Sequence, residues 1–231
     1  MNIYKCIKVI IGFFLLNIIK ADEIDYFWSG AVTSERAVIS FASGKQAKIK
    51  IQYSESKNFK KNKRYTKAIS TDEESHYFAK IQLESLKPNQ TYYYRFNING
   101  RLKKDQIGKF KTHSGKPFSY KVTMATCATT GSNNPVFDRI REENSQFYLM
   151  LGDFHYGDIR RDCEDNFLAY FRATLGSKKQ ARLYNNVSIA YMWDDHDYGP
   201  NNSAGISPNG DGRVACQSEA RKAYKLSLIH I

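Results

Sequence analysis

Acidic side chains and a histidine are concentrated in one short segment, YMWDDHDYGPNN, at residues 191–202. An apolar run leads directly into four consecutive polar residues: Asp194, Asp195, His196 and Asp197. Carboxylates this close repel one another, and they resist burial unless a cation compensates their charge. Aspartate, histidine, asparagine and tyrosine side chains suit hard or borderline metal ions. The segment therefore indicates a metal site.

Two further segments place metal-binding side chains after apolar runs. MATC ends at Cys127, and LGDFHYGD contains Asp153, Tyr156 and Asp158. A lone cysteine is usually a small buried hydrophobe, and a Gly-Asp pair usually belongs to a turn. Three apolar runs that all end in such residues nevertheless favour one shared site. Two metals bridged by Asp153 would activate a water molecule against a phosphoryl group. His155 either contacts the substrate or points away.

The second half of the chain alternates between apolar strands and helical segments. SYKVTMATC, QFYLMLGD and VSIAYMW are typical of buried strands. NNPVFDRIREEN, CEDNFLAYFRATLG and SKKQARLYN are typical of helices, with Asn134 as a cap before Pro135 and with Gly176 as a stop. This order predicts a parallel sheet covered on both faces. Sites in such sheets form outside the carboxyl ends of the strands, so the three polar strand ends would converge.

The first half, residues 24–113, alternates with a period of two. AVISFA, AKIKIQYS, HYFAKIQLES and TYYYRFNI place apolar residues at every second position, and polar breaks separate them. Several short strands of this kind predict a β-sandwich. LKPNQTYYYR, with Tyr92 near the start of a strand, is similar to the tyrosine corner of fibronectin type III-like domains. A short linker is expected around residues 115–117.

The N-terminus has the pattern of a secretory signal peptide, residues 1–21, which predicts a secreted protein. Lys5 and Lys8 precede or interrupt an apolar run that ends near Ala21. The alternative is a membrane anchor, but the run is shorter than the roughly 20 residues that a spanning helix needs. Removal of the signal would take Cys6 with it. Three cysteines would remain: Cys127, Cys163 and Cys216.

The formal net charge of +12 is unevenly distributed. Residues 45–116 contain 18 Lys and Arg against 6 Asp and Glu, whereas residues 121–231 contain 13 of each kind. A basic domain of this type binds nucleic acid or another anionic surface in some proteins. Here the lysines are scattered through strand-like segments without an aromatic stacking motif, which favours a solvated basic face. No nucleic-acid partner is expected.

Together these motifs resemble the PhoD-like alkaline phosphatase/phosphodiesterase family of metallophosphatases. LGDFHYGD, YMWDDHDYGPNN and MATC are similar to its catalytic motifs, and WSGAVTSERAVISF, LKPNQTYYYRF and GKFKT are similar to the fibronectin-type domain before them. The resemblance implies an all-β sandwich at residues 22–114, followed by the first part of an α/β metallophosphatase domain at residues 119–225.

The resemblance also implies roles for single residues. Cys127 matches a thiolate ligand of ferric iron, Asp153 a carboxylate that bridges iron and calcium, and Tyr156 a phenolate ligand of the iron. Asp195 would be a metal ligand and His196 would face the phosphate as an acid or a charge stabiliser. Either of two asparagines would reach the metals: Asn201 or Asn202. The family implies a binuclear or trinuclear iron and calcium site, and zinc or manganese remains the alternative.

The function expected from the resemblance is secreted, metal-dependent hydrolysis of phosphate esters, with no stable membrane span. The alternative is a catalytically inert secreted binding or adhesion protein that retains the fold. The family has further His and Asp ligands downstream of residue 225. The chain is therefore expected to be an incomplete fragment with little or no activity, and residues 226–231, LSLIHI, to be a non-native tail.

Secretion would permit a disulfide and glycosylation. If Cys127 binds metal, Cys163 and Cys216 remain as a candidate disulfide pair, and two free thiols are the alternative. Asn-x-Ser/Thr sequons occur at Asn89, Asn186 and Asn201. Asn89 and Asn186 are the candidate glycosylation sites, because a glycan on Asn201 would block the expected crevice.

Overall fold

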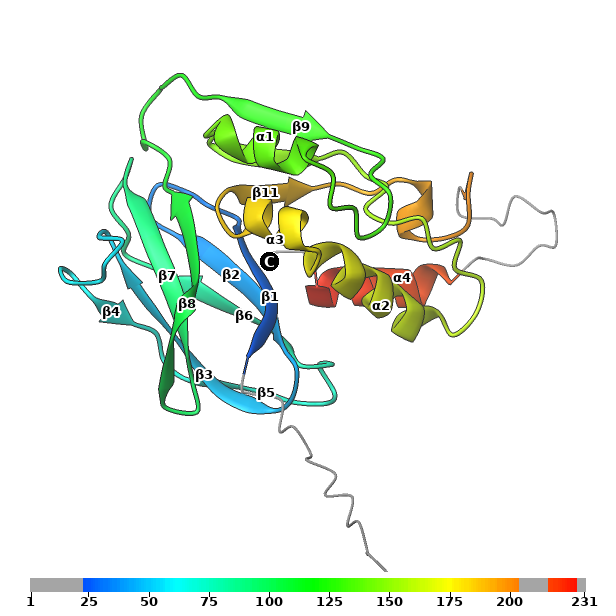
Figure 1. Cartoon of the computed structure of the whole chain (residues 1–231), viewed down its shortest axis with the longest axis horizontal. Coiled ribbons are helices and arrows are strands. Elements are labelled where there is room, and N and C mark those ends of the chain that lie inside the picture. The colour runs from blue at the N-terminus through cyan, green and yellow to red at the C-terminus, as the bar shows by residue number, and fades with distance from the viewer. Residues whose placement is uncertain (1–22, 204–215, 228–231) are drawn as a thin grey trace, which may run out of the picture.

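The computed structural model describes residues 23–203 and 216–227. The first half forms two antiparallel sheets that face each other, as Figure 1 shows. One sheet has the order β1-β2-β6, and the other has the order β4-β3-β7-β8 with β5 paired to β3. The strands are β1 Ile24–Gly30, β2 Ala37–Ser43, β3 Ala47–Ser54, β4 Arg64–Tyr65, β5 Ile69–Thr71, β6 Phe78–Leu83, β7 Thr91–Ile98 and β8 Arg101–Lys111.

A shared aromatic core holds the two sheets together. Every second residue of β7 is buried, and these side chains pack against Phe27, Phe41 and Phe110 from the other strands. Tyr92 makes the expected tyrosine corner, because its hydroxyl accepts a hydrogen bond of 2.9 Å from the backbone N–H of Lys87. Apolar residues alternate with polar ones in these strands because successive side chains point to opposite faces, and one face is buried in the sandwich.

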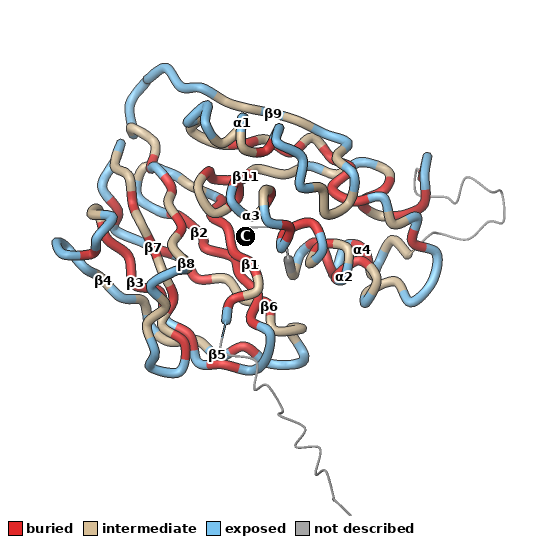
Figure 2. Tube along the Cα trace, viewed as in Figure 1, coloured by how far each residue is buried: buried red, intermediate tan, exposed pale blue. Residues whose placement is uncertain are grey.

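Strands β1 and β2 are an exception to the alternating pattern, since nearly all of their residues are buried. One face of their sheet lies on the sandwich core. The other face carries Tyr26, Trp28 and Ala42 into a second core, formed with the helices of the second half. The red stretches of β1 and β2 in Figure 2 lie at this junction. The two halves are therefore packed against each other through a continuous apolar layer.

The second half contains a three-stranded parallel sheet of order β11-β10-β9. Its strands are β9 Val122–Ala125, β10 Phe147–Met150 and β11 Ser188–Tyr191. Its helices are α1 Val136–Glu142, α2 Cys163–Leu175, α3 Lys178–Tyr184, the 3₁₀ helix η1 Asp195–Asp197, and α4 Gln217–Ser227. An all-β sandwich followed by an α/β part is thus confirmed as the fold class.

The helix boundaries follow the signals in the sequence. Asn134 caps α1, because its side-chain oxygen accepts a hydrogen bond of 3.0 Å from the N–H of Val136. Helix α2 ends at Gly176, as expected. Helix α4 continues through Leu226 and Ser227, the first two residues of the segment expected to be non-native. The rest of that segment and the expected signal peptide lie outside the described residues.

The parallel sheet is less covered than the sequence indicates. No residue of β9 is fully buried, and the side chain of Met124 is 58% exposed. Strand β9 lies at the edge of the sheet, so only β10 has strand neighbours on both sides. The expectation of helices over both faces is therefore wrong for β9. Among the described residues, no helix has the length and apolar character needed to cross a membrane.

Candidate metal centre

The register of the parallel sheet brings the predicted site residues to one edge. The last residue of β10, Met150, is paired with Ala125 of β9 and with Tyr191 of β11. All three strands therefore end at the same level. Cys127 follows two residues after its strand, and Asp153 follows three residues after its own. Parallel strands with aligned ends deliver successive loops to a common crevice, which is where sites form in open α/β sheets.

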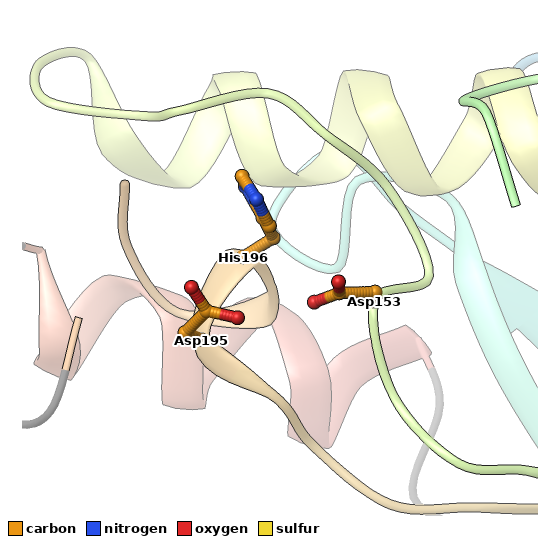
Figure 3. Close-up of side chains that lie close together, drawn as sticks. All are labelled: Asp153, Asp195 and His196. Carbon is orange, nitrogen blue, oxygen red and sulfur yellow. The ribbon is translucent and has the colours of Figure 1, made fainter. Parts of the chain in front are cut away.

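Three of these side chains form a cluster in which one cation would fit. Ligand atoms of Asp153, Asp195 and His196 all lie within 4.8 Å of one another. Figure 3 shows the two carboxylates approaching each other from different loops. Asp153 is buried, and its Oδ1 atom has no hydrogen-bond partner among the described residues. A buried carboxylate oxygen without a donor is costly unless a cation accompanies it, so this donor set fits a metal ion.

A second group of ligand atoms surrounds the same aspartate. The Cys127 thiol donates to Asp153 Oδ2 at 3.5 Å, and the Tyr156 hydroxyl is within hydrogen-bonding reach of both side chains. Asp153 is thus shared between a thiol–phenol group and a carboxylate–imidazole group. The two groups offer sulfur, oxygen and nitrogen atoms of kinds that bind metal cations.

Protonation of the Tyr156 phenol depends on whether a cation is present. Burial, and next the hydrogen bonds with Cys127 and Asp153, raise the pKa of this phenol above its ordinary value. A metal ion acts in the opposite direction, since a nearby cation stabilises the phenolate. The Tyr156 side chain is still 39% exposed, so it is accessible from solvent.

The backbone at the strand ends adopts the left-handed region. Cys127 has a φ of 60°, Asp153 a φ of 53° and Gly152 a φ of 97°. Such values are uncommon for residues other than glycine and cluster at functional sites, where the surrounding fold enforces them. Gly152 also permits a close approach, because a Cβ atom there would lie 2.6 Å from the Cβ of Asp194. The loops after β10 and β11 can approach this closely at position 152 because the residue there is a glycine.

The carboxylate of Asp197 connects the loop after β10 with the segment after β11. It accepts backbone N–H groups from Asp153 at 2.8 Å, from Phe154 at 2.9 Å and from Asp194 at 2.8 Å. The side chain is buried, and this burial raises the pKa of Asp197 to about 6 while the hydrogen bonds oppose the shift. The sequence showed Asp197 in the acidic cluster but did not reveal that it anchors backbone rather than a metal.

His155 points away from the cluster. It is fully buried and packs on Phe167, Tyr170 and Phe171 of α2, with its ring stacked on that of Tyr170. Its Nδ1 accepts a hydrogen bond of 3.3 Å from the N–H of Gly157. His155 therefore anchors the loop after β10 on helix α2, which answers the question that the sequence left open.

The loop after η1 contacts the site through its backbone N–H groups. The N–H of Asn201 donates to Asp158 Oδ1 at 2.7 Å, and the N–H of Asn202 donates to Asp195 Oδ2. Asp158 Oδ1 also lies 3.4 Å from His196 Nδ1. These contacts are made by the main chain of the two asparagines. Both asparagines are exposed, and their side chains remain candidates for metal binding.

A disulfide connects the elements behind the site. The structure joins Cys163, at the start of α2, to Cys216, just before α4, with a Cα–Cα distance of 5.7 Å. Cys127 is the free cysteine among the described residues. Helix α4 in turn supports the strand end before the acidic segment, since Tyr224 packs on Tyr191 and Trp193.

The fold and the cluster together define an architecture: a β-sandwich joined to a parallel sheet whose strand ends carry candidate metal ligands. Residues 27–114 match the family described as PhoD-like phosphatase, N-terminal domain. This match confirms the resemblance to PhoD-like phosphatases for the sequence of the sandwich. Two solved structures confirm it for the fold of both halves.

Two solved structures share the fold over most of the chain. The structure of PhoD matches with a TM-score of 0.77 and 17% identity, over 90% of this chain and 46% of PhoD. The purple acid phosphatase PPD1 from yellow lupin (Lupinus luteus) seeds matches with a TM-score of 0.54 and 15% identity, over 86% of this chain and 39% of the enzyme. The chain thus spans less than half the length of either. No curated protein matches it in sequence.

Proposed function

We propose that this chain carries part of the catalytic centre of a metal-dependent phosphoesterase. The observation that carries the proposal is the position of Asp153, whose carboxylate is shared by two groups of ligand atoms. A bridging carboxylate is what two adjacent cations require. The similarity to PhoD and to a purple acid phosphatase supports phosphate esters as the class of substrate.

Cys127 and Tyr156 would hold one metal, for which we propose iron, and Asp195 the other, for which we propose calcium. Asp153 would bridge them, and the side chain of Asn201 or Asn202 would complete the second site. Zinc or manganese is the alternative to this pair. A binuclear centre of this kind supplies Lewis acidity and lowers the pKa of bound water.

His196 would act on the substrate rather than on the metal. Its side chain is buried, its Nδ1 has no hydrogen-bond partner among the described residues, and its ring lies 4.5 Å from that of Tyr156. Asp158 Oδ1 lies 3.4 Å from this nitrogen, so the imidazole is placed beside the candidate ligands and next to a carboxylate. From there it would donate a proton to the leaving group or stabilise charge on the phosphate.

We also propose that the protein is secreted. The disulfide between Cys163 and Cys216 supports this, because such bonds persist mainly in oxidising compartments. Of the candidate glycosylation sites, Asn89 is exposed in a turn, whereas Asn186 is half-buried and donates its side-chain N–H to Arg182 O at 2.8 Å. We therefore expect Asn89 to be the main acceptor and Asn201 to remain free.

Metal content is the direct test of the proposal. The purified chain is titrated with ferric iron and with calcium, and bound metal is measured at equilibrium with the free metal. We expect both metals in the wild-type chain, a visible iron–phenolate absorption band that Tyr156→Phe removes, and loss of both metals in Asp153→Asn. Asp165→Asn, on the exposed side of α2, is the matched control. A wild-type chain that binds no metal under these conditions would overturn the proposal.

Turnover is a separate measurement. The candidate ligands in the described residues are fewer than two cations need, since calcium alone takes six to eight oxygen ligands. We therefore expect this chain as written to hydrolyse a generic phosphomonoester or phosphodiester weakly or not at all. Rapid hydrolysis that Asp153→Asn abolishes would show instead that the centre is complete in this chain.

A further inference from the structure

The outer face of the five-stranded sheet carries several lysines and an arginine. Residues at alternate positions of β7 face away from the core, and the register fixes their neighbours on the same face. Lys50 of β3 is paired with Asn97, Lys109 of β8 with Tyr93, and Lys111 with Thr91. The positions that point away from the core are Lys48, Lys50, Gln52 and Ser54 on β3, Thr91, Tyr93, Arg95 and Asn97 on β7, and Ile107, Lys109 and Lys111 on β8. Gln52 and Ser54 among them are buried, so they are not open to a ligand.

None of these regularly paired positions carries a carboxylate; the irregular stretch of β8 between Leu102 and Ile107 carries one exposed carboxylate, Asp105. The four lysines among them form no ion pair with any described Asp or Glu, although several carboxylates elsewhere on the chain are paired with Lys or Arg. Arg95 is held in place by a hydrogen bond of 2.7 Å to Gln52 and by the ring of Phe59, 4.0 Å from its guanidinium carbon. The face therefore presents five cations whose charge no described side chain neutralises.

The cations follow one line along the strands. Lys50 lies beside Asn97, near one end of β7, and Lys111 lies beside Thr91 at the other end. Six residues of strand separate these positions, which is roughly 20 Å at about 3.3 Å per residue. A hollow lies at each end: Lys48 and Lys50 line the first, and Lys109, Lys111 and Lys121 line the second.

An exposed basic loop extends the line at the edge of the sheet. The segment between β3 and β4 carries four exposed lysines: Lys57, Lys60, Lys61 and Lys63. Its only acidic residue, Glu55, is paired with Lys87 at 2.9 Å. In Figure 1, strands β3, β7 and β8 lie on the side of the sandwich away from α2 and α4. A ligand on this face would thus leave the candidate metal centre free.

We propose that this outer face, together with the loop between β3 and β4, binds a linear sulfated polysaccharide. A row of unpaired cations matches a row of anionic groups on one extended chain, and release of the counterions of that chain would drive binding. Single-stranded nucleic acid fits less well, because it needs successive aromatic faces for its bases. Of the outward-facing aromatic residues here, Tyr65 is 53% exposed, and Tyr93 is half-buried.

Heparin binding at increasing salt tests the proposal on the full chain. The variants are Lys48→Gln/Lys50→Gln and Lys109→Gln/Lys111→Gln, and the control is Lys178→Gln/Lys225→Gln, which removes the same charge from exposed positions on α3 and α4. By analogy with other linear polyanions, each lost contact lowers the salt slope by about 0.7 to 0.9. We expect each sheet variant to lose about 1.4 to 1.8 from the slope and the control to lose little.

Two comparisons make the outcome decisive. A single-stranded oligonucleotide of matched charge and vesicles with 30% anionic lipid are titrated under the same conditions, and thermal melting shows that each variant is folded. Tighter binding to the oligonucleotide or to the vesicles than to heparin would overturn the proposal. An equal loss in the control variant would also overturn it, because binding would then follow net charge alone.

Discussion

The carboxylate of Asp197 accepts a hydrogen bond of 2.8 Å from the backbone N–H of Asp153, which lies 44 residues earlier in the chain. The same carboxylate holds the loop that follows β11 through the N–H of Asp194. One buried side chain therefore fixes the distance between the two loops that carry the candidate ligands. The position of Asp153 relative to Asp195 depends on it.

Replacement of Asp197 by asparagine should loosen this arrangement. An amide has a single acceptor oxygen and would place its NH₂ group against a backbone N–H, which costs about 1–3 kcal/mol when the group is buried. We expect Asp197→Asn to lower the free energy of unfolding by that amount. We also expect metal affinity to fall about 10- to 100-fold, as for other residues that orient ligands. Denaturant unfolding and metal titration measure the two effects.

The same chemical change at an exposed aspartate is the control. Asp165→Asn, on α2, should alter stability by at most about 1 kcal/mol through the helix dipole and should leave metal affinity unchanged. Wild-type metal affinity in Asp197→Asn would show that the hydrogen bonds to Asp197 do not position the ligands.

Gly152→Ala should be more destabilising than an alanine at another glycine of similar φ. Gly152 and Gly100 have φ values of 97° and 84°, so both substitutions carry the penalty of roughly 1–2 kcal/mol for an L residue in the left-handed region. At Gly152 the new Cβ also meets Asp194, whereas at Gly100 nothing lies within 4 Å. We expect an extra loss of about 1–3 kcal/mol at Gly152 from this overpacking. Equal melting temperatures for the two variants would contradict the proposed loop contact.

His155 should make the protein sensitive to acid. Burial, and next the nearby charge of His196, lower the pKa of His155 to about 3. The unfolded chain takes up this proton below about pH 6.5 and the folded chain does not, so the stability from neutral His155 is lost as the pH falls from 6.5 toward 3. At pH 5 the loss relative to pH 7 is about 2 kcal/mol. Asp197, with its raised pKa, acts in the opposite direction.

Comparison with His155→Phe isolates this contribution, because phenylalanine fits the aromatic site on α2 and does not titrate. The free energy of unfolding is measured at pH 7 and pH 5 for both proteins in the absence of metal. The wild-type protein should lose about 2 kcal/mol more than the variant between the two values. The same pH dependence in both proteins would mean that His155 is protonated in the folded state.

Reduction of the disulfide should destabilise the second half. The bond between Cys163 and Cys216 closes a loop of 53 residues, for which chain entropy gives about 4 kcal/mol at 25 °C. We expect a reducing agent, or Cys163→Ser/Cys216→Ser, to lower the free energy of unfolding by about 4 kcal/mol. The melting temperature should fall accordingly. Cys127→Ser should leave the reductant effect intact, since Cys127 is a free thiol. An unchanged melting temperature on reduction would show that the bond does not form in solution.

Local pattern was sufficient to predict many of the elements, although β1, β4, β5 and η1 were not among those predicted. The alternation of TYYYRFNI predicted β7, Asn134 and Gly176 marked helix ends, and Tyr92 indicated a tyrosine corner. These signals are local, because strand pairing and helix capping act between residues that are close in sequence or repeat with a fixed period. The candidate ligands could also be identified from the sequence, because each one follows an apolar strand.

A β-sandwich, a following α/β unit and a set of candidate metal ligands at the ends of three strands could be predicted from the sequence. The contacts of each side chain could not, because they depend on the tertiary structure. In the tertiary structure, His155 packs on α2 and Asp197 accepts hydrogen bonds from backbone N–H groups. Both faces of β1 and β2 are buried. Side-chain direction and burial depend on contacts between residues far apart in the chain, and a periodic pattern along one segment contains no information about them.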